Sequence, residues 1–193
     1  MAGLFGFGLS FFYIYKNQPP PMRKYILYLF IYISSICSIN GQDQNSTAIG
    51  FYTTGLDHYN KQNYEDAIVD YTKAIVLNQS FAEAYFQRGC AKHNIDDYKG
   101  AVEDFNTSIK LQPNNEIFYK QRASSKTMLK DYNGAISDCD QAIAIKRDYN
   151  KAYALRGILK IEMGEKDGCT DLEKAGEYGY HNAPIFLKKY CLK

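Results

Sequence analysis

Two rows of charged residues recur in this sequence with a period of 34 residues, and each aspartate comes 18 residues before the next arginine. The two rows consist of Asp70, Asp104, Asp138, Arg88, Arg122 and Arg156. A planar guanidinium suits a partly buried, bidentate contact with a carboxylate. We therefore predict structural ion pairs that join neighbouring periods, Asp70 with Arg88, Asp104 with Arg122 and Asp138 with Arg156. The alternative is an arginine row that lines a groove for acidic ligands.

The first period favours the structural interpretation, because Thr54 occupies its arginine position. An arginine there would have no aspartate of an earlier period to pair with, whereas a groove would give no reason for its absence. A lysine row follows the arginines by four residues, at Lys92, Lys126 and Lys160. No lysine has a recognisable activating neighbourhood, so we expect this row to be solvated or paired with acids.

Two cysteines are placed to form a disulfide. Cys169 and Cys191 are equally distant from residue 180, which falls in an expected turn between two helices. Such residues lie side by side in an antiparallel hairpin, and an oxidising exported compartment favours a bond between them. Reduced thiols are the alternative. Cys139 replaces an aromatic residue of the earlier periods, so we expect it to fill the core.

The remaining reactive side chains show no arrangement for catalysis. His58, His93 and His181 are isolated, and neither HExxH nor CxxC spacing occurs. No glycine-rich phosphate loop, GxSxG motif or clustered acid–base pair is present. We expect no catalytic residues, no cofactor and no metal.

A repeated pair of helices must position these residues. A fixed period of this length indicates one supersecondary unit stacked on copies of itself. In the second unit we expect helices over residues 82–94 and 98–111, with Asp96 and Asp97 in the turn. Pro113 ends the second helix, because proline cannot continue one. A single unit cannot bury its apolar face alone, so neighbouring units must stack.

At these positions the chain resembles the tetratricopeptide repeat (TPR) family, over residues 48 to about 177. The matching residues are Phe51, Gly55, Tyr64, Ala67, Tyr71 and Ala74; Tyr85, Gly89, Tyr98, Ala101, Phe105 and Pro113; Tyr119, Ala123, Tyr132, Ala135 and Ala142; and Tyr153 and Gly157. The resemblance implies an all-α fold, an α-solenoid of about four helix–turn–helix units plus a C-terminal capping helix.

The expected organisation follows this register. Its segments are a lead-in over 42–47, units over 48–81, 82–115 and 116–149, a degenerate fourth unit over 150–177 and a capping helix within 178–193. One residue is missing before Asp171, and we place the loss in the turn over 164–167, which aligns Gly168 with the small residues of the earlier units. Solenoids need caps at their ends, and residues 183–190 fit one.

The N-terminal part reads as an export signal. Arg23 and Lys24 precede an apolar run over 25–39, which is short for a spanning helix and typical of a signal peptide over 22–41. Residues 1–21 are then an upstream start-site artefact or an extra apolar segment. The alternative is a membrane anchor that is retained.

Removal of residues 1–41 leaves 20 basic and 21 acidic residues without a basic run, so we expect no nucleic-acid partner. Three glycosylation sequons begin at Asn45, Asn78 and Asn106, and they matter only in a eukaryotic secretory pathway.

The resemblance also implies a concave groove lined by the first helix of each unit. The residues expected to point into it are Tyr52, Tyr59, Phe86, Cys90, His93, Lys120, Ser124, Thr127 and Lys151. Aromatic side chains beside polar ones suit the anchoring of a peptide, although exposed tyrosines are also ordinary here. One TPR subclass grips C-terminal carboxylates from its first unit, and Tyr52 and Leu56 at those positions disfavour that mode.

These observations favour an exported, non-catalytic module that binds a protein or peptide partner. The composition and the expected N-terminal signal resemble those of exported bacterial proteins of the periplasm or cell surface. A second hypothesis is a structural subunit of a membrane-associated envelope assembly, held by the N-terminal apolar segment. An enzyme accessory that uses the groove is a third.

Overall fold

The computed structural model describes Pro19, Tyr28 and residues 43–191. The chain divides into two compact units, residues 1–46 and residues 47–193. The expected upstream segment and signal peptide lie outside the described residues, apart from Pro19 and Tyr28. Within the described residues, no helix combines the length and the apolar character that crossing a bilayer requires.

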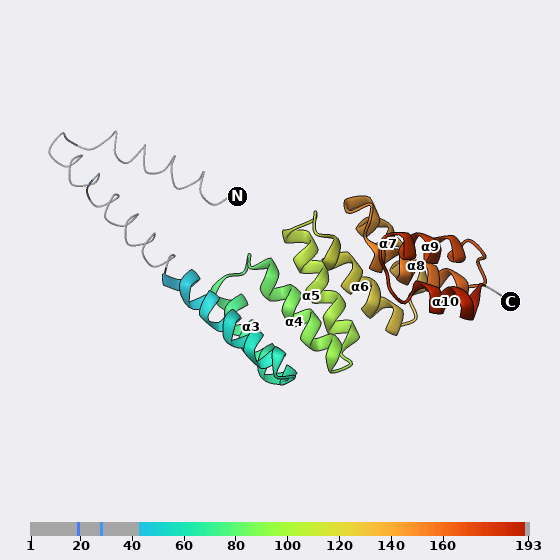
Figure 1. The fold of residues 1–193 in the computed structure, drawn as a ribbon. Helices are drawn as coiled ribbons and strands as arrows, with labels where there is room; N and C mark the ends of the chain where they lie inside the picture. The colour runs from blue at the N-terminus through green and yellow to red at the C-terminus, as the bar shows by residue number, and fades with distance from the viewer. Residues whose placement is uncertain (1–18, 20–27, 29–42, 192–193) are drawn as a thin grey trace. The chain divides into compact units, whose positions relative to one another are not determined.

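The second unit is built from consecutive helical pairs (Figure 1). A helical segment over residues 47–60 comes first. The helices that follow are α3 (Tyr64–Leu77), α4 (Ala82–Asn94), α5 (Tyr98–Leu111), α6 (Glu116–Met128), α7 (Tyr132–Ile145), α8 (Asn150–Glu162), α9 (Gly168–Glu177) and α10 (Ala183–Tyr190). The predicted bounds of α4, α5 and α10 are confirmed.

The turn inside each pair has the same conformation in the first three units. Gln62, Asp96 and Lys130 each have a φ of 63°, in the left-handed region, and Gly164 takes this place in the fourth unit with a φ of 84°. In the second and third units an aspartate then caps the second helix where the turn ends. The Asp97 carboxylate, for example, accepts a hydrogen bond from the Gly100 N–H at 3.0 Å.

Small residues set the distance between the two helices of a pair. Ala101 is fully buried, and a Cβ added to Gly89 would lie 2.8 Å from the Phe105 ring. Helices α8 and α9 also approach closely, because a Cβ on Gly168 would lie 2.5 Å from the Gly157 carbonyl oxygen and one on Gly157 would lie 2.7 Å from that of Gly168. Gly168 therefore occupies the position expected for it.

Stacking repeats this contact along the chain. Each second helix packs against the first helix of its own unit and that of the next, and α4 contacts α6 as α6 contacts α8. Cys139 is fully buried in this core, as predicted. The described residues contain helices and no strands. The predicted α-solenoid with a terminal capping helix is therefore confirmed.

Candidate functional site

The arginine row forms buried forks with aspartates of the same unit. Arg88 donates from Nε and Nη2 to the two carboxylate oxygens of Asp104, at 2.9 and 2.6 Å. Arg122 holds Asp138 at the same two distances. Arg156 holds Asp171 at 2.8 and 2.5 Å. Each fork joins the two helices of one pair.

The predicted pairing between units was therefore wrong in register. Asp70 does not pair with Arg88, Asp104 does not pair with Arg122, and Asp138 does not pair with Arg156, because each guanidinium turns its fork toward its own unit. The third nitrogen still reaches the preceding unit. The three acceptors of Nη1 are Thr72 Oγ1 at 3.0 Å, Asn106 Oδ1 at 2.7 Å and Asp140 Oδ1 at 2.6 Å.

This third contact accounts for Thr54 in the first unit. No described repeat precedes the first unit, so an arginine at position 54 would find no acceptor there for its Nη1. Asp70 is instead 2.9 Å from Lys73 Nζ and 3.1 Å from His58 Nδ1, the latter without hydrogen-bond alignment. The absence of an arginine from the first unit thus still reflects the stacking of the units. The contact between units is made by Nη1, however, and not by the ion pair that we predicted.

The lysine row completes the same ion clusters. Lys92 and Lys126 each place Nζ 2.9 Å from the aspartate that their unit's arginine holds, and Lys160 lies 3.3 Å from Asp171. The aspartate side chains of these clusters are only 4–6% exposed. The arginine forks are fully used inside the protein, so they are not open to an acidic ligand.

The nine predicted groove residues divide into three groups of three, and the aromatic group packs against neighbouring helices. The Tyr52 ring lies 4.8 Å from that of Phe81, and Phe86 stacks on Phe118 at 4.6 Å. The Tyr59 hydroxyl accepts a hydrogen bond from Asn94 Nδ2 at 3.0 Å. Burial raises the pKa of both tyrosines. These side chains are only partly buried, so they pack between helices and also contribute surface.

Three other predicted groove residues are engaged within the protein. Cys90 was expected in the groove but is 5% exposed, because it packs between Ala101 and Phe105 in the core. His93 Nδ1 lies 2.8 Å from Ser125 Oγ, and burial lowers the pKa of this imidazole. The Thr127 hydroxyl donates to the carbonyl of its own helix four residues earlier, at 2.8 Å.

The last three predicted residues line one cavity of about 300 Å³. Lys120 and Ser124 come from α6, and Lys151 comes from the first turn of α8. The apolar and aromatic part of the lining consists of Ala154, Leu155, Ile158 and Tyr180. We call this cavity the lysine pocket.

Electrostatics distinguish the lysine pocket from the ion clusters. Burial, and then the charge of Lys151, lower the pKa of the Lys120 ammonium group. Lys120 Nζ donates to Gln121 Oε1 at 2.9 Å. Among the described residues, no carboxylate lies within salt-bridge distance of Lys120 or Lys151. The pocket therefore presents two like charges beside an apolar wall, which is the arrangement that an anionic group with an apolar neighbour would complement.

Sequence reasoning did not predict the lining residues Ala154, Leu155, Ile158 and Tyr180, and of these only Tyr180 lies outside the repeats. It lies in the turn between α9 and α10 and packs against Tyr153, Ala154 and Ala175. Its position has no equivalent in the repeat, so the 34-residue register gave no signal for it. The aromatic side chain three residues before the start of the expected capping helix was the only indication.

The cysteines fall into two classes. Cys169 and Cys191 form the disulfide that the hairpin symmetry predicted, with 5.9 Å between their Cα atoms. Cys90 and Cys139 are free and buried. Burial raises the pKa of the Cys90 thiol to about 11 and that of the Cys139 thiol to about 12. The described residues contain no group of three or more His, Cys, Asp or Glu side chains suited to a metal.

Comparison with known proteins identifies the repeat. A TPR repeat model matches residues 55–96, and a tetratricopeptide repeat model matches residues 82–115. No curated protein sequence matches the chain.

Solved structures share the fold. MamA is 23% identical with a TM-score of 0.68, over 76% of this chain and 86% of that one. YrrB, described as a TPR protein with an unusual peptide-binding site, is 18% identical with a TM-score of 0.63, over 80% and 82%. The first TPR of Spaghetti (RPAP3), bound to the HSP90 peptide SRMEEVD, is 28% identical with a TM-score of 0.55, over 56% and 89%. The chain thus contains tetratricopeptide repeats, and its described helices have the fold of a TPR solenoid.

Proposed function

We propose that this protein is a non-catalytic interaction module that binds an extended peptide segment of a partner. The lysine pocket would bind a carboxylate of that segment, and Leu155, Ile158 and Tyr180 would contact an apolar side chain next to it. The observation that carries this proposal is the contrast between two sets of lysines. Lys92, Lys126 and Lys160 are each paired with an aspartate, whereas the two pocket lysines have no carboxylate partner among the described residues.

The physical reason is the cost of two ammonium groups that line the same pocket. Desolvation and mutual repulsion disfavour the charged form of Lys120, and an anion between the lysines would offset both effects. Hydrogen bonds to charged groups contribute about 1.5–3 kcal/mol each when they are formed in a partly buried site. Two such contacts would therefore orient a peptide firmly.

The aromatic residues of the first helices extend the same proposal along the stack. Tyr52, Tyr59 and Phe86 keep part of their surface exposed and would contact further residues of the segment. Proteins of similar fold support a peptide ligand: the RPAP3 domain is bound to SRMEEVD, and the second TPR domain of human RPAP3 is in complex with the HSP70 peptide SGPTIEEVD. Both peptides are acidic near their C-terminal ends.

A selection experiment tests this function. Random short peptides with a free C terminus are selected on the immobilised full chain, and the bound peptides are sequenced. We expect enrichment of acidic residues or terminal carboxylates next to leucine, isoleucine or phenylalanine. The Lys120→Glu/Lys151→Glu variant should reverse the preference toward basic peptides, whereas the exposed Lys110→Glu control on α5 should leave it unchanged. Enrichment that is equal in all three proteins would refute the proposal.

For localisation we propose export, on the basis of the basic pair and apolar run that precede the repeats in the sequence. A signal peptide over 22–41 predicts that the mature protein begins at Gln42. Retention of the apolar run would instead make the protein a subunit of a membrane-associated assembly. N-terminal sequencing of the native protein separates the two, since a native protein that begins before the apolar run contradicts export with cleavage.

A further inference from the structure

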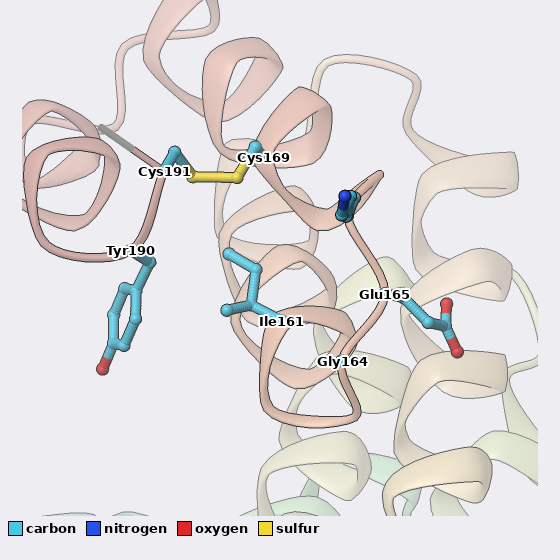
Figure 2. Close-up of a pocket in the computed structure, with 7 residues that line it drawn as sticks. Ile161, Gly164, Glu165, Cys169, Tyr190 and Cys191 are labelled. Carbon is cyan, nitrogen blue, oxygen red and sulfur yellow. A yellow bond between two sulfur atoms is a disulfide. The ribbon is translucent and has the colours of Figure 1, made fainter. Parts of the chain in front are cut away.

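The disulfide lines a cavity of about 430 Å³ in the helical unit. Both cysteines are only partly buried, and the other lining side chains include Ile161, Glu165 and Tyr190. Figure 2 shows Ile161 and Tyr190 on either side of the space below the sulfur–sulfur bond, while Glu165 points away from it. The bond is therefore open to a small thiol reagent or to a short loop of a protein.

The disulfide is also a principal attachment of the capping helix. Helix α10 has eight residues, and Ala183 at its start is its only buried side chain. A helix of this length is marginal in water without tertiary contacts. Its other end is held at Cys191, through the bond to Cys169 on α9. Past Ala183, the side chains of Phe186, Leu187 and Tyr190 are only partly buried, so the bond is the covalent anchor of the C-terminal half of α10.

An aromatic series connects this helix to the lysine pocket. The Tyr190 ring lies 6.3 Å from that of Phe186, and Phe186 lies 6.4 Å from Tyr180, with both ring pairs nearly parallel. Tyr180 lines the lysine pocket together with Lys120. Release of α10 would therefore remove support from one wall of that pocket.

We propose that Cys169–Cys191 is a thiol–disulfide exchange site for a dithiol reductant, and that its reduction frees α10 and opens the Tyr180 wall of the lysine pocket. One thiolate of the dithiol attacks a cystine sulfur and releases the other cysteine as a thiolate, which gives a mixed disulfide. The second thiol of the reductant then displaces the first cysteine. Two electrons and two protons pass to the protein, which gains two thiols, and the reductant becomes a disulfide. The regulatory consequence rests on the proposed function of the lysine pocket.

The exchange itself is tested with dithiothreitol on the full native chain, followed by iodoacetamide and mass spectrometry of each cysteine. We expect alkylation of Cys169 and Cys191 roughly a hundredfold faster than that of Cys90 and Cys139, which are buried internal controls. If Cys169 and Cys191 are alkylated only after denaturation, the exchange site is refuted.

The structural consequence is tested by hydrogen exchange and by amine labelling. On reduction, amide protection over residues 185–190 should fall about tenfold or more, while that of α4 and α5 stays constant. Acetylation of Lys120 by N-hydroxysuccinimidyl acetate should become at least about twofold faster, relative to Lys110. The Cys169→Ser/Cys191→Ser variant should match the reduced protein and not respond to dithiothreitol.

These readouts separate the two proposals, because none of them uses a peptide. Unchanged protection of α10 or an unchanged rate at Lys120 would overturn the link between disulfide and pocket. A chain that shows both changes but selects no acidic peptides in either redox state would refute the proposed function and support the disulfide inference.

Discussion

The corrected register of the ion clusters can be tested by a double-mutant cycle on Arg122 and Asp138. The fork between them is mostly buried, since their side chains are 17% and 4% exposed. Removal of one partner from a buried pair costs about 3–5 kcal/mol, because it leaves an uncompensated charge. Lys126 Nζ remains 2.9 Å from Asp138 and lowers that cost, so we expect about 2–3 kcal/mol for Arg122→Ala.

The cycle compares the observed pair with the pair that the sequence suggested. The coupling energy between Arg122→Ala and Asp138→Ala should be about 2 kcal/mol, as for residues in direct contact. The matched cycle of Arg122→Ala with Asp104→Ala should give less than about 0.5 kcal/mol, because those two residues share no contact.

Urea denaturation followed by circular dichroism gives the free energies of unfolding, and urea avoids the screening of ion pairs that guanidinium salts cause. The slope of each transition should be the same in all variants. A larger coupling for Arg122 with Asp104 than for Arg122 with Asp138 would refute the pairing inside units and restore the pairing between them.

Three further predictions concern single side chains. Thr54→Arg should stabilise the protein by about 0.5–1 kcal/mol in thermal denaturation, by forming the missing fork to Asp70, and the gain should vanish in the Asp70→Ala background. The lowered pKa of His93 means that the folded state disfavours protonation of its imidazole, so the free energy of unfolding should decline as pH falls through about 6.5. His93→Gln should reduce that decline. An equal decline in both proteins would contradict the effect of burial on His93. The buried Tyr71 hydroxyl has no hydrogen-bond partner among the described residues, so Tyr71→Phe should be neutral or stabilising by up to about 1 kcal/mol in urea, and a clear loss of stability would reveal an unseen partner.

The local elements of the fold were predictable because short-range chemistry determines them. Helix α5 begins after the Asp97 cap and ends before Pro113, and both signals are visible in the sequence. The close contact of α8 with α9 was also readable from Gly157 and the shifted Gly168. In these cases one or two side chains decide the outcome.

The register of the ion pairs was not predictable from periodicity alone. Each arginine has one aspartate 18 residues before it and another 15 or 16 residues after it, and both fit a repeat. The choice depends on the rotation of the two helices, which places the fork of Arg88 toward Asp104 and only its third nitrogen toward Thr72.

The lysine pocket was predictable only in part. Lys120, Ser124 and Lys151 follow from the expected inner face of the first helices. Tyr180 closes the pocket from a turn that belongs to no repeat, where its packing against Tyr153, Ala154 and Ala175 places it.

The most direct test of the proposed function is the affinity of one selected acidic peptide, measured by fluorescence anisotropy at fixed ionic strength. Lys120→Gln and Lys151→Gln should each weaken binding about tenfold, since the loss of one charge-assisted contact corresponds to about 1.4 kcal/mol. Lys110→Gln is the matched control and should leave the affinity unchanged. Equal affinity in all four proteins would contradict the account, because the lysine pocket would then have no part in binding.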